Sequence, residues 1–215
     1  MPNKTLEEKL TEGRQYREFT VSDFELRTLE DGQKTVRGYA TTFDRPYVLY
    51  REPGYVFLEQ VDRAAFQDCD LSDVIMQYDH EGRVFARGSN NTLQITPDNF
   101  GLLTMAYLGG TQIGNQLYEE IDGGYTTKMS YGFRVAEDKR EVTEDYETGD
   151  IRVLRTILKI EKVYDVSAVS LPANDMTSIA VRSYGEGVIA EVKEEFLALK
   201  NRERQKKKIK IMLNL

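Results

Sequence analysis

A single histidine, His80, limits the acid-base chemistry available to this chain of 215 residues. An imidazole has an ordinary pKa of about 6.5, so it can both take up and return a proton near neutral pH. His80 lies in the acidic run Asp79-His80-Glu81, directly after the strand-like stretch 73–78. One imidazole cannot build a two-histidine metal site, and the acidic clusters at 68–70 and 144–150 lack the spacing of a calcium loop. We expect no metal and no cofactor. His80 is the candidate general base, and a solvated histidine in a turn is the plain alternative.

Ser130 is the hydroxyl that such a base could activate, since a free serine is too weak a nucleophile at neutral pH. Side chains alternate along the stretch 128–134, so Met129, Tyr131 and Phe133 share one face of a predicted strand. Ser130 shares the other face with Gly132, whose missing side chain leaves room for another group to approach the hydroxyl. The pattern also fits a structural serine.

Asp165 is the candidate for the third group, which would hold the imidazole in one tautomer and stabilise its charged form. It lies within 164–171, a stretch that is otherwise mostly apolar or small. A buried carboxylate there costs several kcal/mol unless another group pairs with it. Glu161 and Asp79 are alternative acids, and a surface position for Asp165 fits the alternation equally well.

The elements that must position these residues are mainly strands. Period-two alternation and β-branched or aromatic content predict strands at 16–26 (with one interruption), 36–43, 56–61, 74–78, 93–96, 102–108, 127–135, 151–160 and 163–171. Asp62 is a predicted cap for a short helix over 63–66. Thr111 is a predicted cap for a longer helix to Ile121 that ends at Gly123-Gly124. Such a pattern describes a β-barrel or a sandwich of α+β type, and we expect mainly an antiparallel β-barrel with inserted helices.

Composition favours one domain with tails at both ends. We expect a flexible N-terminal arm over 1–14, a barrel domain over 15–182, and a C-terminal helix (186–207) with a basic tail within 183–215. The net charge of -7 argues against specific nucleic-acid binding, although 202–210 carries six basic residues and one acidic one. A lone Cys69 indicates no oxidising compartment, and no stretch approaches the roughly 18 apolar residues of a membrane span. We expect a cytoplasmic location and no membrane partner.

An ordered set of motifs then resembles the prohead, or capsid-maturation, serine proteases of tailed bacteriophages. The set runs over about 37–182 and comprises Gly38-Tyr39-Ala40-Thr41-Thr42-Phe43, Asp79-His80, Leu93, Gly101-Leu102, Met129-Ser130-Tyr131-Gly132-Phe133, Asp165-Val166-Ser167-Ala168-Val169 and Pro172-Ala173-Asn174. The resemblance implies a fold distantly related to the herpesvirus assemblins. It also implies a substrate, the scaffolding segment of the major capsid protein, and trimming of the protease's own tail inside the assembling prohead in the host bacterium.

Carried over by position, the resemblance makes Ser130 the nucleophile, His80 the general base and Asp165 the orienting acid, where the family more often has glutamate. The herpesvirus relatives use a second histidine, which this chain lacks, and their dimers make a homo-oligomer plausible. Oxyanion donors would be backbone N–H groups or an arginine such as Arg83 or Arg87. The competing hypothesis is a non-enzymatic scaffold or capsid-binding module. It predicts that Ser130 and His80 lie more than about 4 to 5 Å apart.

Overall fold

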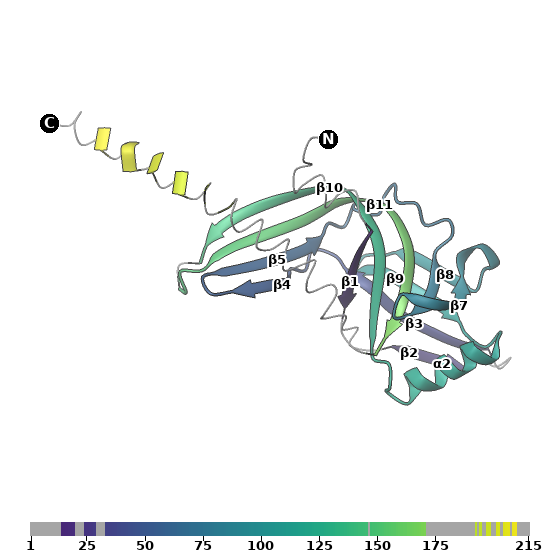
Figure 1. Ribbon diagram of the computed structural model, residues 1–215. Helices are drawn as coiled ribbons and strands as arrows, with labels where there is room; N and C mark the ends of the chain where they lie inside the picture. The colour runs from purple at the N-terminus through teal and green to yellow at the C-terminus, as the bar shows by residue number, and fades with distance from the viewer. Residues whose placement is uncertain are drawn as a thin grey trace, which may run out of the picture.

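Two β-sheets and a helix make up most of the fold (Figure 1). The computed structural model describes residues 14–19, 24–28, 33–145, 147–170 and positions scattered between 192 and 209. Within this part of the chain, no helix is long and apolar enough to cross a membrane. The catalytic candidates all belong to the larger of the two sheets, or to the turn that follows one of its strands.

The larger sheet is built around two long neighbouring strands, β10 (Lys128–Glu144) and β11 (Ile151–Val169), which pair antiparallel. β1 (Gln15–Phe19) pairs with the other edge of β10. β11 pairs in parallel with β5 (Tyr55–Val61) along its first half and with β6 (Ile75–Tyr78) along its second half. β4 (Tyr47–Glu52) and β7 (Glu81–Arg87) complete the sheet beside β5 and β6.

The smaller sheet has the order β2-β3-β9-β8. Its strands are β2 (Glu25–Thr28), β3 (Lys34–Thr42), β8 (Leu93–Pro97) and β9 (Gly101–Tyr107), with the short 3-10 helix η1 (Gly88–Asn90) before β8. Helix α2 (Gln112–Asp122) follows, and its Thr111 side chain accepts the Gly114 N–H, as the sequence predicts. α2 turns Leu117 and Ile121 into the core.

The main core holds the apolar face of β10, with Met129, Tyr131 and Phe133 all buried and the last two rings stacked. This agrees with the alternation read from the sequence and leaves Ser130 on the opposite face. A second, smaller cluster joins Phe57, Val153 and Val192 at the distal part of β5 and β11. The described positions between 192 and 209 are helical, as predicted for 186–207, and 186–191 lie outside the described residues.

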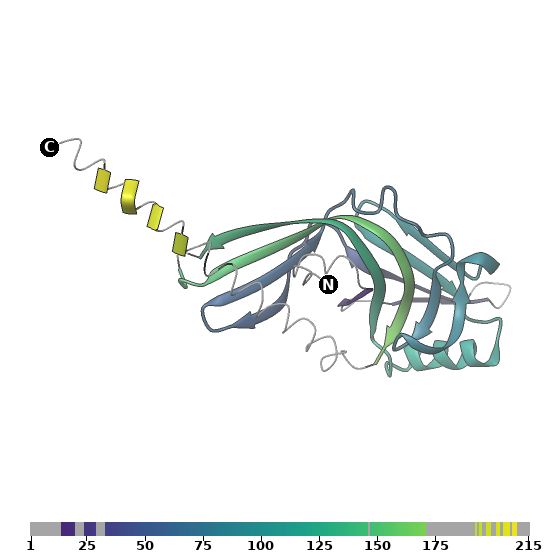
Figure 2. The ribbon, with the colours of Figure 1, turned by 45° about the horizontal axis from the view of Figure 1, so that its top comes forward.

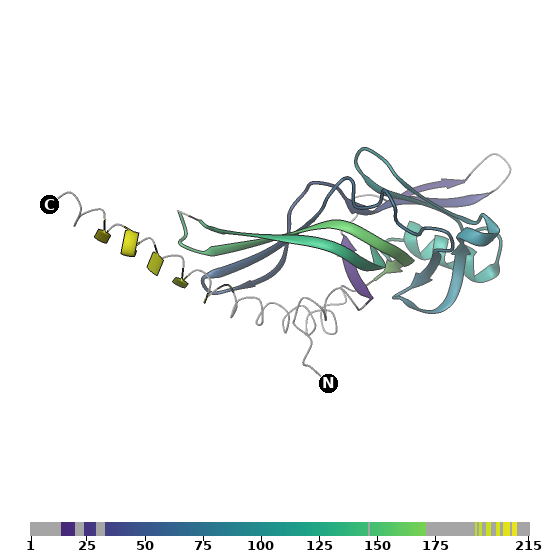
Figure 3. The ribbon, with the colours of Figure 1, turned by 90° about the horizontal axis from the view of Figure 1, so that it is seen from above.

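The predicted β-barrel does not form within the described part of the chain. Among the described residues the strands separate into two open sheets, and β10 and β11 extend as a curved arm beyond the core (Figures 2 and 3). Alternation identifies a strand but carries no information on its partner, so closure could not be read from it. The domain boundaries remain predictions: residues 1–13 and the boundary at 182 lie outside the described part.

Several local expectations also differ. β4 and β7 were not predicted. β7 is a polar strand with largely exposed side chains, and β4 is a short strand without a clear alternation of buried and exposed positions. The two strands expected at 151–160 and 163–171 form one continuous β11. The short helix expected after Asp62 is instead a series of turns, in which the Asp62 carboxylate accepts the Ala64 N–H at 2.8 Å.

Candidate active site

Three adjacent strands bring the candidate residues together. Ser130 lies on β10 opposite Ser167 of β11, and Gly132 lies opposite Asp165. β6 pairs with the same part of β11, and Asp79 and His80 follow its last residue. Both residues adopt a left-handed backbone, with φ of 48° and 61°. This unusual turn directs the imidazole back over β10 and β11.

The imidazole of His80 links the other two side chains. Its Nε2 lies 2.6 Å from Ser130 Oγ, and its Nδ1 is hydrogen-bonded to Asp165 Oδ2. With Asp165 ionised, Nδ1–H donates to the carboxylate, and Nε2 is left to accept the Ser130 hydroxyl hydrogen. The hydroxyl, imidazole and carboxylate therefore stand in the order required for a relay of hydrogen bonds.

Ser167 supports this arrangement, although the sequence analysis did not single it out. Its hydroxyl accepts the backbone N–H of His80 at 3.1 Å and donates to Asp165 Oδ2 at 3.1 Å. The signal was present in the sequence, because residues two apart on a strand share a face and Ser167 stands two residues after Asp165. Ser167 therefore fixes both the turn that carries His80 and the carboxylate that orients it.

The site is buried. Ser130 and Asp165 are 0% exposed, and the His80 side chain is 12% exposed. Burial lowers the pKa of His80 to about 4, and the positive charge of nearby Arg14 acts in the same direction. His80 is therefore neutral at pH 7, the state in which Nε2 can accept a proton.

Gly132 is required by the close approach of Asp165. A Cβ at this position would collide with Asp165 Oδ1 and would lie 2.8 Å from Arg14 Nε. The space that the sequence analysis predicted beside Ser130 is thus filled by the carboxylate and by Arg14.

Arg14 and two residues of β1 cover the members of the trio. Arg14 forms an ion pair with Asp165 Oδ1, and the Tyr16 ring packs edge-on against His80 with centroids 4.3 Å apart. The Arg17 carbonyl accepts a hydrogen bond from Ser130 Oγ at 3.0 Å. From the sequence alone, Arg14 falls in the predicted flexible arm, and neither it nor the residues that follow it are expected at the site.

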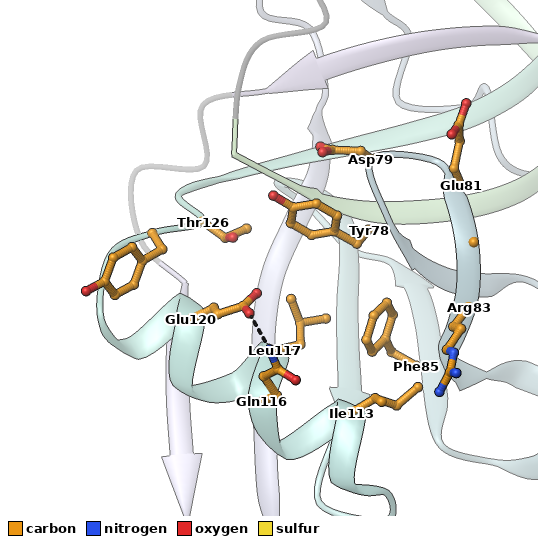
Figure 4. A pocket seen from close by; sticks show the side chains of 12 residues that line it. Tyr78, Asp79, Glu81, Arg83, Phe85, Ile113, Gln116, Leu117, Glu120 and Thr126 are labelled. Atoms are coloured by element: carbon orange, nitrogen blue, oxygen red, sulfur yellow. Dashed lines mark hydrogen bonds between the residues drawn. The ribbon is translucent and has the colours of Figure 1, made fainter.

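The alternative residues point elsewhere. Glu161 pairs with Arg134 at 3.1 Å, and Arg87 Nε donates to Asp73 at 2.8 Å. Asp79 and Arg83 line a separate pocket of about 890 Å³ between α2 and the β6–β7 hairpin (Figure 4). Phe85, Ile113 and Leu117 also line this pocket. Asp165 is thus the acid in contact with the imidazole, and none of the residues His80, Ser130 and Asp165 lines the pocket.

A buried hydroxyl hydrogen-bonded to an imidazole, which is in turn hydrogen-bonded to a carboxylate, is the arrangement found in serine hydrolases. The sequence matches the family described as caudovirus prohead serine protease over residues 22–189. The chain belongs to that family of phage prohead proteases, and the resemblance noted in its sequence is confirmed.

Two further comparisons were made. No curated protein matches the chain. Among solved structures, the capsid assembly protease of bacteriophage T4 aligns with a TM-score of 0.42 and 12% sequence identity, covering 73% of this chain and 96% of that one.

Proposed function

We propose that this prohead protease is a serine endopeptidase in which Ser130 is the nucleophile, His80 the general base and Asp165 the orienting acid. The observation that supports these roles best is the 2.6 Å separation between His80 Nε2 and Ser130 Oγ. It lies within hydrogen-bonding reach and far inside the 4 to 5 Å limit beyond which a non-catalytic module would be favoured.

In the proposed reaction, Ser130 Oγ attacks a peptide carbonyl carbon while Nε2 takes up the hydroxyl proton. The C–N bond of the tetrahedral intermediate then breaks, and His80 returns the proton to the leaving amine. Water releases the acyl group from Ser130 by the same steps with His80 again as base. Asp165 stays ionised throughout and stabilises the imidazolium. Because Arg87 is held by Asp73, we propose backbone N–H groups as the oxyanion donors.

The substrate we propose is the scaffolding segment of the major capsid protein, with trimming of the protease's own tail as a second reaction. Family membership supports this choice. The protein would act as a homo-oligomer inside the assembling prohead in the host cytoplasm. Its protease domain would span 15–182, with distant kinship to the herpesvirus enzymes.

Co-expression with the capsid protein tests the proposal. We expect Ser130→Ala to reduce processing by about 10³-fold or more, because the nucleophile is lost. Ser89→Ala, an exposed serine in η1, is the matched control and should process normally. Undiminished processing by Ser130→Ala would contradict the assignment and favour the scaffold or capsid-binding module.

A further inference from the structure

β1 occupies the place that a substrate peptide needs. Its residues 15–19 pair antiparallel with 129–133 of β10, the stretch that carries Ser130. With β1 in place Ser130 is 0% exposed, so no other polypeptide can reach the hydroxyl. An edge strand offers unpaired backbone groups to any extended chain, which is a common way of binding peptides. Without β1, β10 would be an edge strand on this side, with unpaired backbone groups at residues 129–133.

The backbone of β1 also contacts the nucleophile directly. The Arg17 carbonyl oxygen lies 3.0 Å from Ser130 Oγ, so a peptide carbonyl already stands at the nucleophile. The serine hydroxyl has one hydrogen to donate, and donation to Arg17 takes it away from His80. β1 therefore fills the site and also competes with the base for the proton of Ser130.

The Arg17 side chain enters a buried ionic pocket on the other face of β10. Its Nε donates to Glu59 Oε1 at 2.6 Å and its Nη2 to Glu59 Oε2 at 3.0 Å. Arg155 donates to the same carboxylate at 2.9 Å and also pairs with Asp138. Glu59 and Arg155 are 0% exposed.

Charge balance in this pocket depends on Arg17. Two guanidinium groups, of Arg17 and Arg155, face two carboxylates, of Glu59 and Asp138. If β1 leaves, one negative charge in the pocket loses its partner, and an uncompensated buried charge is strongly unfavourable. A vacated pocket would therefore select a positively charged side chain from whatever peptide replaces β1.

We propose that the β10 edge is the peptide-binding edge of the protease, that the Glu59 pocket receives an arginine or lysine of the substrate, and that β1 is a tethered occupant which substrate must displace. The inference rests on the proposed peptidase function, because it assigns the substrate class of the same site.

The first experiment measures access to position 130 without requiring catalysis. The full chain carries Cys69→Ser and Ser130→Cys, so the introduced thiol is the sole one, and its alkylation by iodoacetamide is timed. Arg14→Ala/Tyr16→Ala weakens β1 and leaves the Glu59 pocket intact, and we expect alkylation at least 10-fold faster. Arg17→Ala is a second loosened variant, and thermal unfolding checks that each protein is folded. Equal rates in all folded variants would overturn the occupant role of β1.

The second experiment measures selectivity in the Arg14→Ala/Tyr16→Ala protein. A capped hexapeptide with the sequence of residues 15–20 should slow alkylation, and its Lys analogue should act similarly. Analogues with Glu or Leu in place of the arginine should need at least 10-fold higher concentrations, and Glu59→Gln should reduce that preference to below 3-fold. Equal protection by all peptides would overturn the basic pocket, and no protection by any would overturn the binding edge. Neither readout uses cleavage, so a failed processing test would count against the proposed function alone.

Discussion

At the scale of single residues, Asp165 is the centre of the site. Its carboxylate receives the imidazole of His80, the hydroxyl of Ser167 and the guanidinium of Arg14. An aspartate reaches the imidazole here because β10 and β11 pair directly and its carboxylate occupies the space that a side chain at Gly132 would take. A short acid therefore suits a site whose strands lie side by side.

The single histidine makes the protonation state of the base directly measurable. The groups that face His80 are Asp165, Ser130, Tyr16 and Arg14. With its pKa lowered to about 4 by burial and by Arg14, His80 should stay neutral as pH falls from 8 to 5. Arg14→Ala/Tyr16→Ala removes a positive charge and exposes the ring, so the pKa should rise toward about 6.5. The Cε1–H resonance in an NMR titration reports both values.

Arg63→Ala serves as the control, because Arg63 pairs with Asp44 on the surface and should leave the midpoint unchanged. A midpoint near 6.5 in the unaltered protein that does not move in Arg14→Ala/Tyr16→Ala would show that β1 does not cover the imidazole in solution. In the uncovered variant His80 becomes protonated as pH falls through the raised pKa. On acidification its reactivity as a base should therefore be lost at a higher pH than in the unaltered protein.

At the scale of elements, the close pairing of β10 with β11 is what allows the carboxylate to face the serine. Only a residue without a side chain fits at Gly132, since a Cβ would collide with Asp165 Oδ1 and come too close to Arg14 Nε. The absence of a side chain at one position of β10 therefore determines where a carboxylate of β11 can lie.

Gly132→Ala should therefore destabilise the fold by about 1 to 3 kcal/mol, the usual cost of adding a methyl group to a filled site. Urea unfolding measures this. Gly110→Ala is the matched control, because the nearest atom to its added Cβ is 3.4 Å away on Tyr107, and it should change stability by less than about 0.5 kcal/mol. Equal stability of the two variants would mean that Asp165 does not approach β10 as closely as described.

At the scale of the whole molecule, β11 joins two regions with separate apolar packing. Its first half pairs with β5 beside the Phe57, Val153 and Val192 cluster, and its second half pairs with β6 beside the trio. The main core does not include the distal cluster. A substitution that destabilises the distal cluster should therefore have little effect on the region around the trio.

Val192→Asp tests that separation. Val192 is 3% exposed, and an unpaired carboxylate in its place should weaken packing against Phe57 and Val153. Hydrogen exchange should accelerate at the helical positions between 192 and 209, while the β6 amides and the His80 titration stay unchanged. Leu197→Asp, at a position 61% exposed, should have little effect on either. A shifted His80 titration in Val192→Asp would show that the two regions are coupled.

The sequence predicts the candidate residues and most of the strands, but it does not predict which strands pair with one another. Ser130, His80 and Asp165 became candidates because each is an unusual residue within a strand pattern or a turn, and their roles were assigned from the resemblance to the prohead proteases. α2 was predicted because Thr111 and Gly123 mark its ends. The open sheets, the burial of Arg17 against Glu59 and the cover formed by β1 depend on pairing between residues far apart in the chain. Alternation is a local property, so these features could not follow from it.

The parallel pairing of β6 with β11 constrains the order in which this protein can fold during its synthesis on the ribosome. His80 is translated long before Asp165, and β6 has no place in the large sheet until 165–168 emerge. Such long-range pairing forms late and slowly. In a nascent chain, His80 therefore has no Asp165 to orient it. β1 is synthesised before β11, so it is already available to cover the site when β11 pairs with β10 and β6.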